Sequence, residues 1–188
     1  ITIDGHDVRD IPQDQLREIV GIALQEALLF QGDVRFNLKF GAQGVEDKQM
    51  FEAAKAADAH GFVTGLPETW GAPVARRGYN FSGGQRQRLS IARTLTAAPK
   101  VLILDDSTSA LDVATESRVQ AAIPELYEGI STIYIAQRIS AVIDLDRIVL
   151  MENGEITAIG THEELLASSP LYQEIYESQL GGVEEEKA

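Results

Sequence analysis

The sequence contains no cysteine, and this absence excludes two kinds of structure. Among 188 residues there is no Cys, so neither a disulfide scaffold nor a thiolate metal site can form. The longest apolar runs are only a few residues, whereas a membrane-spanning helix needs about 20. Asp and Glu outnumber Lys and Arg by 29 to 16, which gives a net charge of −13. This balance argues against a nucleic-acid partner, because phosphate contacts need clustered Lys and Arg.

A phosphate-binding loop is also missing. No glycine is followed by lysine, so the motif G-x-x-x-x-G-K-[ST] does not occur. The absence matters because "VLILDD", residues 101–106, predicts a buried strand that ends in two carboxylates. Mg²⁺ commonly takes one or two carboxylates together with substrate phosphates. One interpretation therefore places Asp105 on Mg²⁺ and Asp106 beside an attacking water; the other is a strand end at which Asp106 or Ser107 caps the next helix.

Predicted strands and helices alternate along the chain, which favours an α/β fold with a mostly parallel sheet and helical cover. Thr161 with Glu164 forms a capping-box pattern, Asn153-Gly154 predicts a hairpin turn, and Pro170 opens a last helix. Pro124 is expected to kink or shorten its helix. The expected strands are residues 19–24, 101–105 and 131–137, the expected helices include 46–60 and 113–128, and residues 61–80 are expected to form an irregular loop.

The stretch "FSGGQ", residues 81–85, predicts a helix N-terminus that can face an anion. Ser82 and Gln85 have capping-box spacing, and Gly83 and Gly84 let a ligand approach free backbone amides at the positive end of the helix dipole. The alternative is a capped helix start that needs glycine for a tight turn. On physical grounds alone the two interpretations are evenly matched.

Taken in order, these motifs resemble the ATP-binding-cassette (ABC) family, in particular the nucleotide-binding domains of exporters. "FSGGQ" is similar to the family signature, "VLILDD" to the Walker B strand, "SALD" at residues 109–112 to the D-loop, and "ALQEALLFQG" to the Q-loop region. The resemblance implies a P-loop NTPase-like (RecA-like) core, incomplete at the N-terminus, with an α-helical subdomain. It also implies that the phosphate loop, the adenine-stacking aromatic and the membrane part lie before Ile1, so that the chain is a fragment of a longer polypeptide.

The resemblance assigns roles to parts of the chain and to single residues. Residues 1–30 correspond to the N-terminal part of the core, 31–98 to the helical subdomain, 99–172 to the rest of the core, and 173–188 to the end of the last helix and an acidic tail. The implied cofactors are ATP and Mg²⁺. The implied catalytic residues are Asp106 and Gln137, the implied metal ligands are Asp105 and Gln25, and the implied ATP-binding residues are Gln25, Ser82, Gly83, Gly84, Gln85, Asp105 and Asp112.

Three positions depart from the family pattern. Asp106 stands where the family has a catalytic glutamate, Gln137 where it has the switch histidine, and Arg77 where exporters usually have an acidic residue. The first two departures together predict a degenerate ATP site, of the kind found in one subunit of heterodimeric bacterial multidrug exporters. The signature of this chain would then complete the ATP site of its partner, and the fragment alone would be inactive.

The resemblance implies a transmembrane domain of the same transporter and a second nucleotide-binding domain as partners, and a location on the cytoplasmic face of the cell membrane. An alternative is the head lobe of a non-transport ABC ATPase for chromosome maintenance or DNA repair. That lobe follows a long coiled coil and has its Q-loop elsewhere, whereas Gln25 lies within this segment and no heptads are visible. A regulatory module that binds ATP without turnover is a third interpretation.

Overall fold

The structure, a computed structural model, describes residues 1–42 and 44–180. Two compact units make up the chain, Ile1–Ile135 and Ala136–Ala188. The predicted acidic tail, residues 181–188, lies outside the described residues. None of the helices in the described ranges is both long and apolar enough to cross a bilayer.

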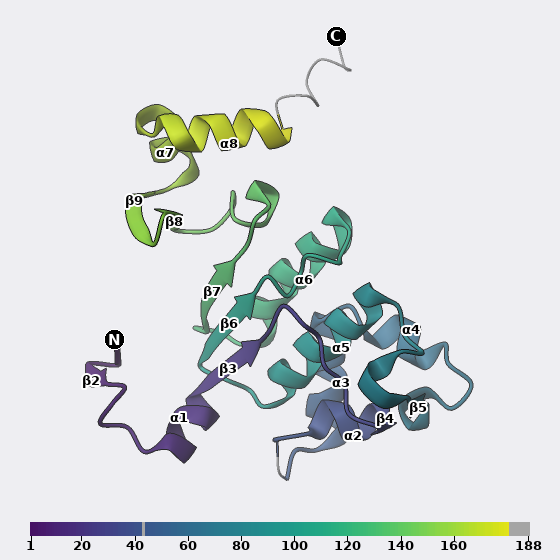
Figure 1. Cartoon of the computed structure of the whole chain (residues 1–188). Helices are drawn as coiled ribbons and strands as arrows, with labels where there is room; N and C mark the ends of the chain where they lie inside the picture. Colours follow the sequence, from purple (N-terminus) through teal and green to yellow (C-terminus); the bar gives the residue numbers. More distant parts are fainter. Residues whose placement is uncertain (43, 181–188) are drawn as a thin grey trace. The chain divides into compact units, whose positions relative to one another are not determined.

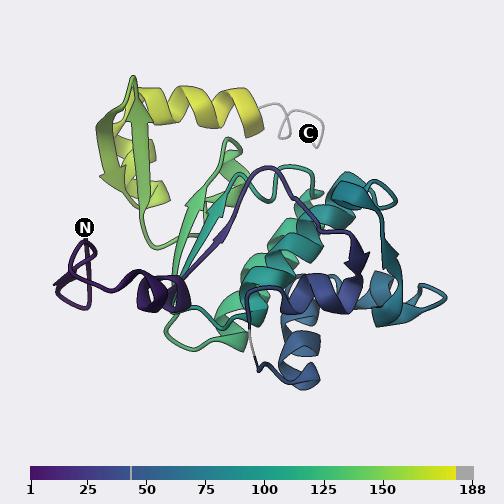
Figure 2. The same ribbon diagram turned by 60° about the horizontal axis from the view of Figure 1, so that its bottom comes forward.

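The first unit is built around a three-stranded parallel sheet, as predicted (Figure 1). Strand β6 (Val101–Asp105) lies in the middle, between β3 (Val20–Ala23) and β7 (Ser131–Ile135). Figures 1 and 2 both show helices α3 (Asp47–Ala56) and α5 (Gly83–Thr96) on the same side of this sheet. The remaining elements of the unit are β1 (Thr2–Ile3), β2 (His6–Asp7), α1 (Gln13–Ile19), β4 (Gly32–Asp33), α2 (Val34–Lys39), α4 (His60–Thr64), η1 (Thr69–Gly71), β5 (Pro73–Val74), η2 (Arg76–Gly78) and α6 (Val113–Leu126).

The core of this unit joins one face of the sheet to α5. Leu102 and Leu104 of β6 are fully buried, as are Leu89 and Leu95 of α5. Residues on the opposite face are more exposed: Ile22 of β3 is 50% exposed, and the isoleucines of β7 on this face are exposed to a similar extent. That face borders a groove of about 1160 Å³. The prediction of a buried strand is therefore correct for alternate residues only, because successive side chains of a strand point to opposite faces.

Residues 46–80 are more regular than predicted. The helix expected over residues 46–60 ends at Ala56, because Asp58 adopts a left-handed backbone with φ 52°. The prediction of an irregular loop over residues 61–80 is wrong. This segment contains most of α4, two short 3₁₀ helices and β5, which pairs with β4. Pro124 lies within the last turn of α6, and the helix continues to Leu126.

The second unit contains the predicted hairpin and two helices. Strands β8 (Ile148–Glu152) and β9 (Glu155–Gly160) are antiparallel, and both turn residues, Asn153 and Gly154, have positive φ, as a type I′ turn requires. Helix α7 (His162–Ser168) begins with the predicted capping box, and α8 (Pro170–Leu180) begins at the predicted proline. These elements and η3 (Ile139–Ala141) surround a small core of Ile139, Ile148, Leu165 and Tyr172.

Candidate functional site

Gln25 and Asp106 meet at the carboxyl edge of the parallel sheet. The register of β3 and β6 pairs Ala23 with Leu104. Gln25 and Asp106 each lie two positions after one of these residues, so the parallel register places them opposite each other. Gln25 Nε2 donates to Asp106 Oδ2 at 2.9 Å. The structure thus brings together two predicted site residues that are 81 positions apart. Carboxyl ends of strands in open α/β sheets are the usual place for ligand sites.

The backbone around Asp106 is held in an unusual conformation. Asp106 has φ 47°, a left-handed value that a residue other than glycine adopts infrequently. Its N–H donates to the carbonyl of Ile135 (2.8 Å), and its own carbonyl accepts from Ser109 Oγ (2.8 Å). These contacts hold the backbone of Asp106 in this conformation. Backbone strain of this kind is typical of functional sites.

The donor set at this edge fits Mg²⁺ held largely by a substrate. Asp105 ends β6 and is half-buried, and the structure describes no hydrogen bond to its carboxylate within residues 1–42 and 44–180. Because Gln25 uses its amide nitrogen toward Asp106, its Oε1 atom stays available as a second oxygen ligand. Across the same residues, no three His, Asp or Glu side chains gather to hold a metal. A site with one or two protein oxygens agrees with the preference of Mg²⁺ for substrate phosphates and water.

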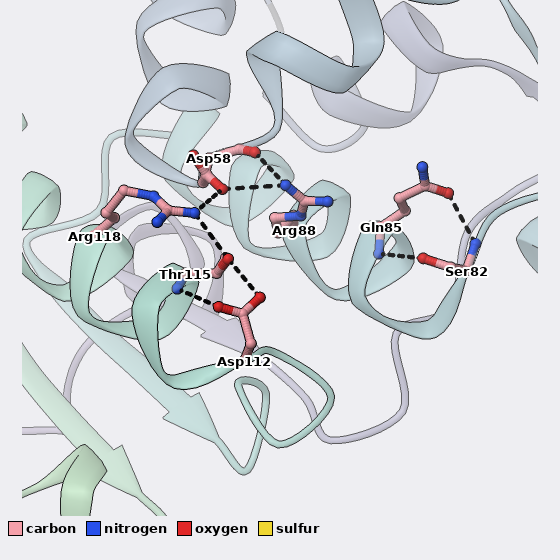
Figure 3. Close-up of polar contacts among 7 residues, drawn as sticks. All are labelled: Asp58, Ser82, Gln85, Arg88, Asp112, Thr115 and Arg118. Atoms are coloured by element: carbon pink, nitrogen blue, oxygen red, sulfur yellow. Dashed lines mark hydrogen bonds and ion pairs between the residues drawn. The ribbon is translucent and has the colours of Figure 1, made fainter.

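Ser82 and Gln85 form the predicted capping box at the start of α5 (Figure 3). Gln85 N donates to Ser82 Oγ (3.2 Å), and Ser82 N donates to Gln85 Oε1 (2.9 Å). Since Ser82 Oγ acts as an acceptor here, its own proton can point to a further acceptor. The amides of Gly83 and Gly84, in the first turn, have no acceptor within the helix. The helix start therefore offers one hydroxyl and two amides to an anion.

Gln87 was not foreseen as a site residue, yet it links α5 to the loop after β6. Its side chain is buried; Gln87 Oε1 accepts from Ala110 N (2.8 Å) and Gln87 Nε2 lies 3.3 Å from Ser109 Oγ. Gly84 makes the same approach possible, because a Cβ there would lie 3.1 Å from the Ala110 carbonyl. One sign of this role is visible in the sequence: Gln87 is a polar residue at a helix position that faces the core.

Asp112 is the N-cap of α6 and starts a chain of polar contacts (Figure 3). It accepts from Thr115 N (2.9 Å) and Thr115 Oγ1 (2.8 Å), and these bonds lower the pKa of its carboxyl. Arg118 then donates to Thr115 Oγ1 (2.9 Å) and Asp58 Oδ2 (3.1 Å). Arg88 of α5 also donates to Asp58 (2.8 Å to its carbonyl). The structure thus gives Asp112 a capping role and connects the loop before it to the left-handed residue after α3.

Gln137, the remaining predicted site residue, belongs to the second unit. Its carbonyl accepts from Gln179 Nε2 (2.9 Å), and Gln179 Oε1 accepts from Ile139 N (2.8 Å). These two bonds fix the backbone on both sides of Arg138. The residue that the sequence pattern places at the switch position therefore has a defined main-chain environment within its own unit.

Comparison with known proteins identifies the family. The sequence profile described as "ABC transporter" matches residues 1–109. The chain belongs to the ABC transporter family. Its α/β fold is accordingly the ABC ATPase fold, a variant of the P-loop NTPase fold, and the resemblance of the motifs to this family is confirmed.

Curated relatives in the family are exporters by name. The ATP-dependent lipid A-core flippase of Syntrophus aciditrophicus (strain SB) is 44% identical over 180 residues, which cover 96% of this chain and 30% of that protein. A putative multidrug export ATP-binding/permease protein of Staphylococcus aureus (strain NCTC 8325 / PS 47) is 42% identical over 95% of this chain and 31% of that protein. The chain therefore spans about a third of the length of the curated relatives it matches.

A solved exporter structure has the same fold. The structure of a bacterial Atm1-family ABC exporter with ATP bound superposes with a TM-score of 0.91 at 35% sequence identity, over 95% of this chain and 32% of that one. Both kinds of relative are transporters, which does not favour the alternative of a chromosome-maintenance or DNA-repair head.

Proposed function

We propose that the chain is the nucleotide-binding domain of an ABC exporter and that ATP binding and hydrolysis at this domain drive export of a substrate. The contact between Gln25 and Asp106 at the sheet edge is the observation that carries the proposal, because it joins the Q-loop to the Walker B carboxylates. The exporter names of relatives at 42–44% identity support it. The chain acts at the cytoplasmic face of the cell membrane, together with a transmembrane domain of the same transporter.

Two nucleotide-binding domains hold ATP between them in this proposal. The hydroxyl of Ser82 and the amides of Gly83 and Gly84 bind the terminal phosphate of the ATP in the partner's site, where the positive end of the α5 dipole stabilises negative charge. Such preorganised donors are most useful where charge builds up in the transition state. Gln85 positions Ser82 through the capping box, and Gln87 fixes the neighbouring D-loop at Ala110.

On the family pattern, the chain's own ATP site contains Gln25, Asp105 and Asp106, and the same pattern makes Gln137 the switch residue. Asp105 and Gln25 Oε1 would hold Mg²⁺, which would supply positive charge to neutralise the phosphates. Asp106 is one methylene shorter than glutamate, so its carboxylate falls about 1.5 Å short of a glutamate carboxylate on the same backbone. A misplacement of about 1 Å can slow a reaction on the order of 10²-fold. Gln137 can donate a hydrogen bond, but unlike histidine it cannot carry a proton.

These two substitutions support a degenerate site that mainly holds ATP, and therefore a second, different nucleotide-binding domain that supplies the working catalytic carboxylate. The assembled exporter is then a heterodimer in which this chain contributes its signature to the competent site. This arrangement corresponds to that of heterodimeric bacterial multidrug exporters.

Reconstitution of the assembled exporter in proteoliposomes tests the proposal. ATP hydrolysis and ATP-dependent substrate movement are measured with and without Mg²⁺, and both are expected to require Mg²⁺ and an intact Ser82. A protein that hydrolyses ATP but moves no substrate, and whose turnover responds to added DNA, would support the chromosome-maintenance alternative instead. ATP binding without any turnover would support a regulatory module.

A further inference from the structure

One carboxylate of the first unit contacts two helices that follow predicted site motifs (Figure 3). Asp58 lies just after α3, and its Oδ2 atom accepts from Arg88 of α5 and from Arg118 of α6, each at 3.1 Å. Helix α5 begins at the signature motif, and α6 begins at the end of the D-loop motif. A single oxygen atom therefore links the helices that follow these two motifs.

The contact with Arg118 continues to the D-loop motif. Arg118 donates to Thr115 Oγ1 (2.9 Å), and that hydroxyl donates in turn to Asp112 (2.8 Å). A hydroxyl can donate and accept at the same time, so these two bonds are compatible. Asp112 is the last residue of the motif and the N-cap of α6. The position of Arg118 is therefore coupled to the start of α6 by hydrogen bonds in series.

The contact with Arg88 continues to the signature motif. Arg88 also donates to the Asp58 carbonyl (2.8 Å), and its guanidinium carbon lies 4.8 Å from the centre of the Phe62 ring. Phe62 packs edge-on against Phe81, the first residue of the motif, with ring centres 6.3 Å apart. The Arg88 side chain is only 20% exposed. A guanidinium held on two sides in this way leaves little freedom to the start of α5.

The backbone of Asp58 is held in place as well. Its φ of 52° is left-handed, a conformation that Asp and Asn adopt more readily than other residues with a side chain. The next residue, Ala59, donates its N–H to the Ala54 carbonyl (2.7 Å) and so closes the end of α3. The Arg118 side chain is 57% exposed, and ion pairs of such exposure contribute little to stability. The main effect of this pair is therefore to fix the position of α6 relative to α5.

We infer that Asp58 is a positioning residue for the ATP site that this chain completes: through Arg88 and Arg118 it holds the signature and D-loop motifs at a fixed spacing. The inference rests on the proposed function, in which Ser82 and the first amides of α5 bind the terminal phosphate. Asp58 acts only through the two arginines. A misplacement of about 1 Å far from the chemistry can slow a reaction on the order of 10²-fold. ATP affinity depends mainly on the partner's phosphate loop, so loosening Asp58 affects turnover more than binding.

The test compares two carboxylates at opposite ends of α3 in the assembled exporter. Asp47, in the first turn of α3, also pairs with two cations, Arg35 and Lys39, but both belong to α2. Asp58→Asn keeps the side-chain shape and suits the left-handed backbone, and it should lower kcat roughly tenfold. The KM for ATP should change by about twofold at most, and Asp47→Asn should change neither constant by more than that. Both variants are assayed at a temperature at which they are fully folded.

A second substitution tests the route to the D-loop motif. Arg118→Met keeps a long unbranched side chain but removes the donors to Asp58 and Thr115. It should lower kcat roughly threefold, and adding it to Asp58→Asn should cause little further loss, because changes within one network are not additive. Effects that multiply in the double variant would overturn the inference.

Amide hydrogen exchange follows the same contacts without relying on turnover. In the ATP-free assembly, Asp58→Asn should speed exchange of the Thr115 amide about twofold to tenfold, as expected for weakening one hydrogen-bonded link, and Asp47→Asn should not. The inference is overturned if this exchange rate is unchanged, if the two Asn variants have the same effect on kcat, or if Asp58→Asn alters only the KM for ATP. If the wild-type assembly does not hydrolyse ATP, the proposed function fails, and the exchange rates still decide whether Asp58 holds the two helices together.

Discussion

The amide nitrogen of Gln25 lies 2.9 Å from a carboxylate oxygen of Asp106, although 81 positions separate the two residues. The parallel register of β3 and β6 produces this proximity, because it sets Ala23 beside Leu104. A one-residue slip would move every side chain of a strand to the opposite face. The contact therefore depends on the sheet and not on either local sequence.

Restoring the family residues should raise turnover at the chain's own site. In the assembled exporter, Asp106→Glu with Gln137→His supplies the longer carboxylate and a titratable side chain, and a positioned general base typically contributes about 10²- to 10⁴-fold. Each single change should give less than the pair. Steady-state ATPase activity is measured with the partner's catalytic residues disabled. No gain in the double variant would show that the loss of function has another origin.

Local sequence signals predicted the local structure well. Both capping boxes, at Ser82 and Thr161, and the Asn153-Gly154 turn formed as expected, because each depends on residues within four positions. The left-handed backbones at Asp58 and Asp106 were not predicted.

Tertiary contacts explain those two failures. Asp58 is held by Arg88 and Arg118 from α5 and α6, and Asp106 by the neighbouring strand β7. Gln87 was missed for the same reason, since its role requires the loop at Ala110 to approach α5. The family resemblance predicted which residues to expect at the site, but only the strand register shows that Gln25 and Asp106 touch.

The 188-residue chain by itself is expected to bind ATP weakly, with a dissociation constant of roughly 1 mM or more. It contains no G-x-x-x-x-G-K-[ST] motif, and that loop normally supplies the amides and the lysine that hold the phosphates. Isothermal titration of the folded chain with Mg²⁺ and ATP measures the affinity, and circular dichroism confirms that the sample is folded. Tight, Mg²⁺-dependent binding would contradict the expectation.

The N-cap of α6 should make stability depend on pH. Hydrogen bonds from Thr115 lower the pKa of Asp112 in the folded state, so its stabilising contribution is present above the unfolded value of about 4 and is lost as pH falls through the lower folded value. Asparagine caps helices almost as well but does not titrate. The difference in unfolding free energy between wild type and Asp112→Asn should therefore shrink as pH falls from about 5 to 3.

Urea unfolding at a series of pH values checks this dependence. Asp146→Asn serves as a control, because Asp146 is exposed and no hydrogen bond of its side chain is described. A difference for Asp112→Asn that stays constant over this range would show that the Thr115 contacts do not persist in solution.

The two half-sites should respond unequally to mutation in the assembled exporter. Asp106→Ala is expected to change ATPase activity only modestly, because the proposed degenerate site contributes little turnover. Ser82→Ala should reduce activity on the order of 10²- to 10³-fold, which is typical for the loss of one preorganised donor. Thr161→Ala is the matched control: it removes the same kind of capping box at α7, so it reproduces the loss of helix capping without touching the proposed phosphate site.

Gly83 allows the electrostatic part of this asymmetry to be tested separately. A Cβ at Gly83 would meet only Ala110 Cβ at 3.6 Å, an ordinary contact, whereas at Gly84 it would lie 3.1 Å from a carbonyl oxygen. Gly83→Ala should therefore leave the fold intact and cost less activity than Gly83→Asp, which places a negative charge against the phosphate and should abolish most activity. Steady-state ATPase activity of all five variants decides the assignment. If Asp106→Ala abolishes turnover while Ser82→Ala and Gly83→Asp leave it intact, the half-sites are reversed and this chain carries the working Walker B carboxylate.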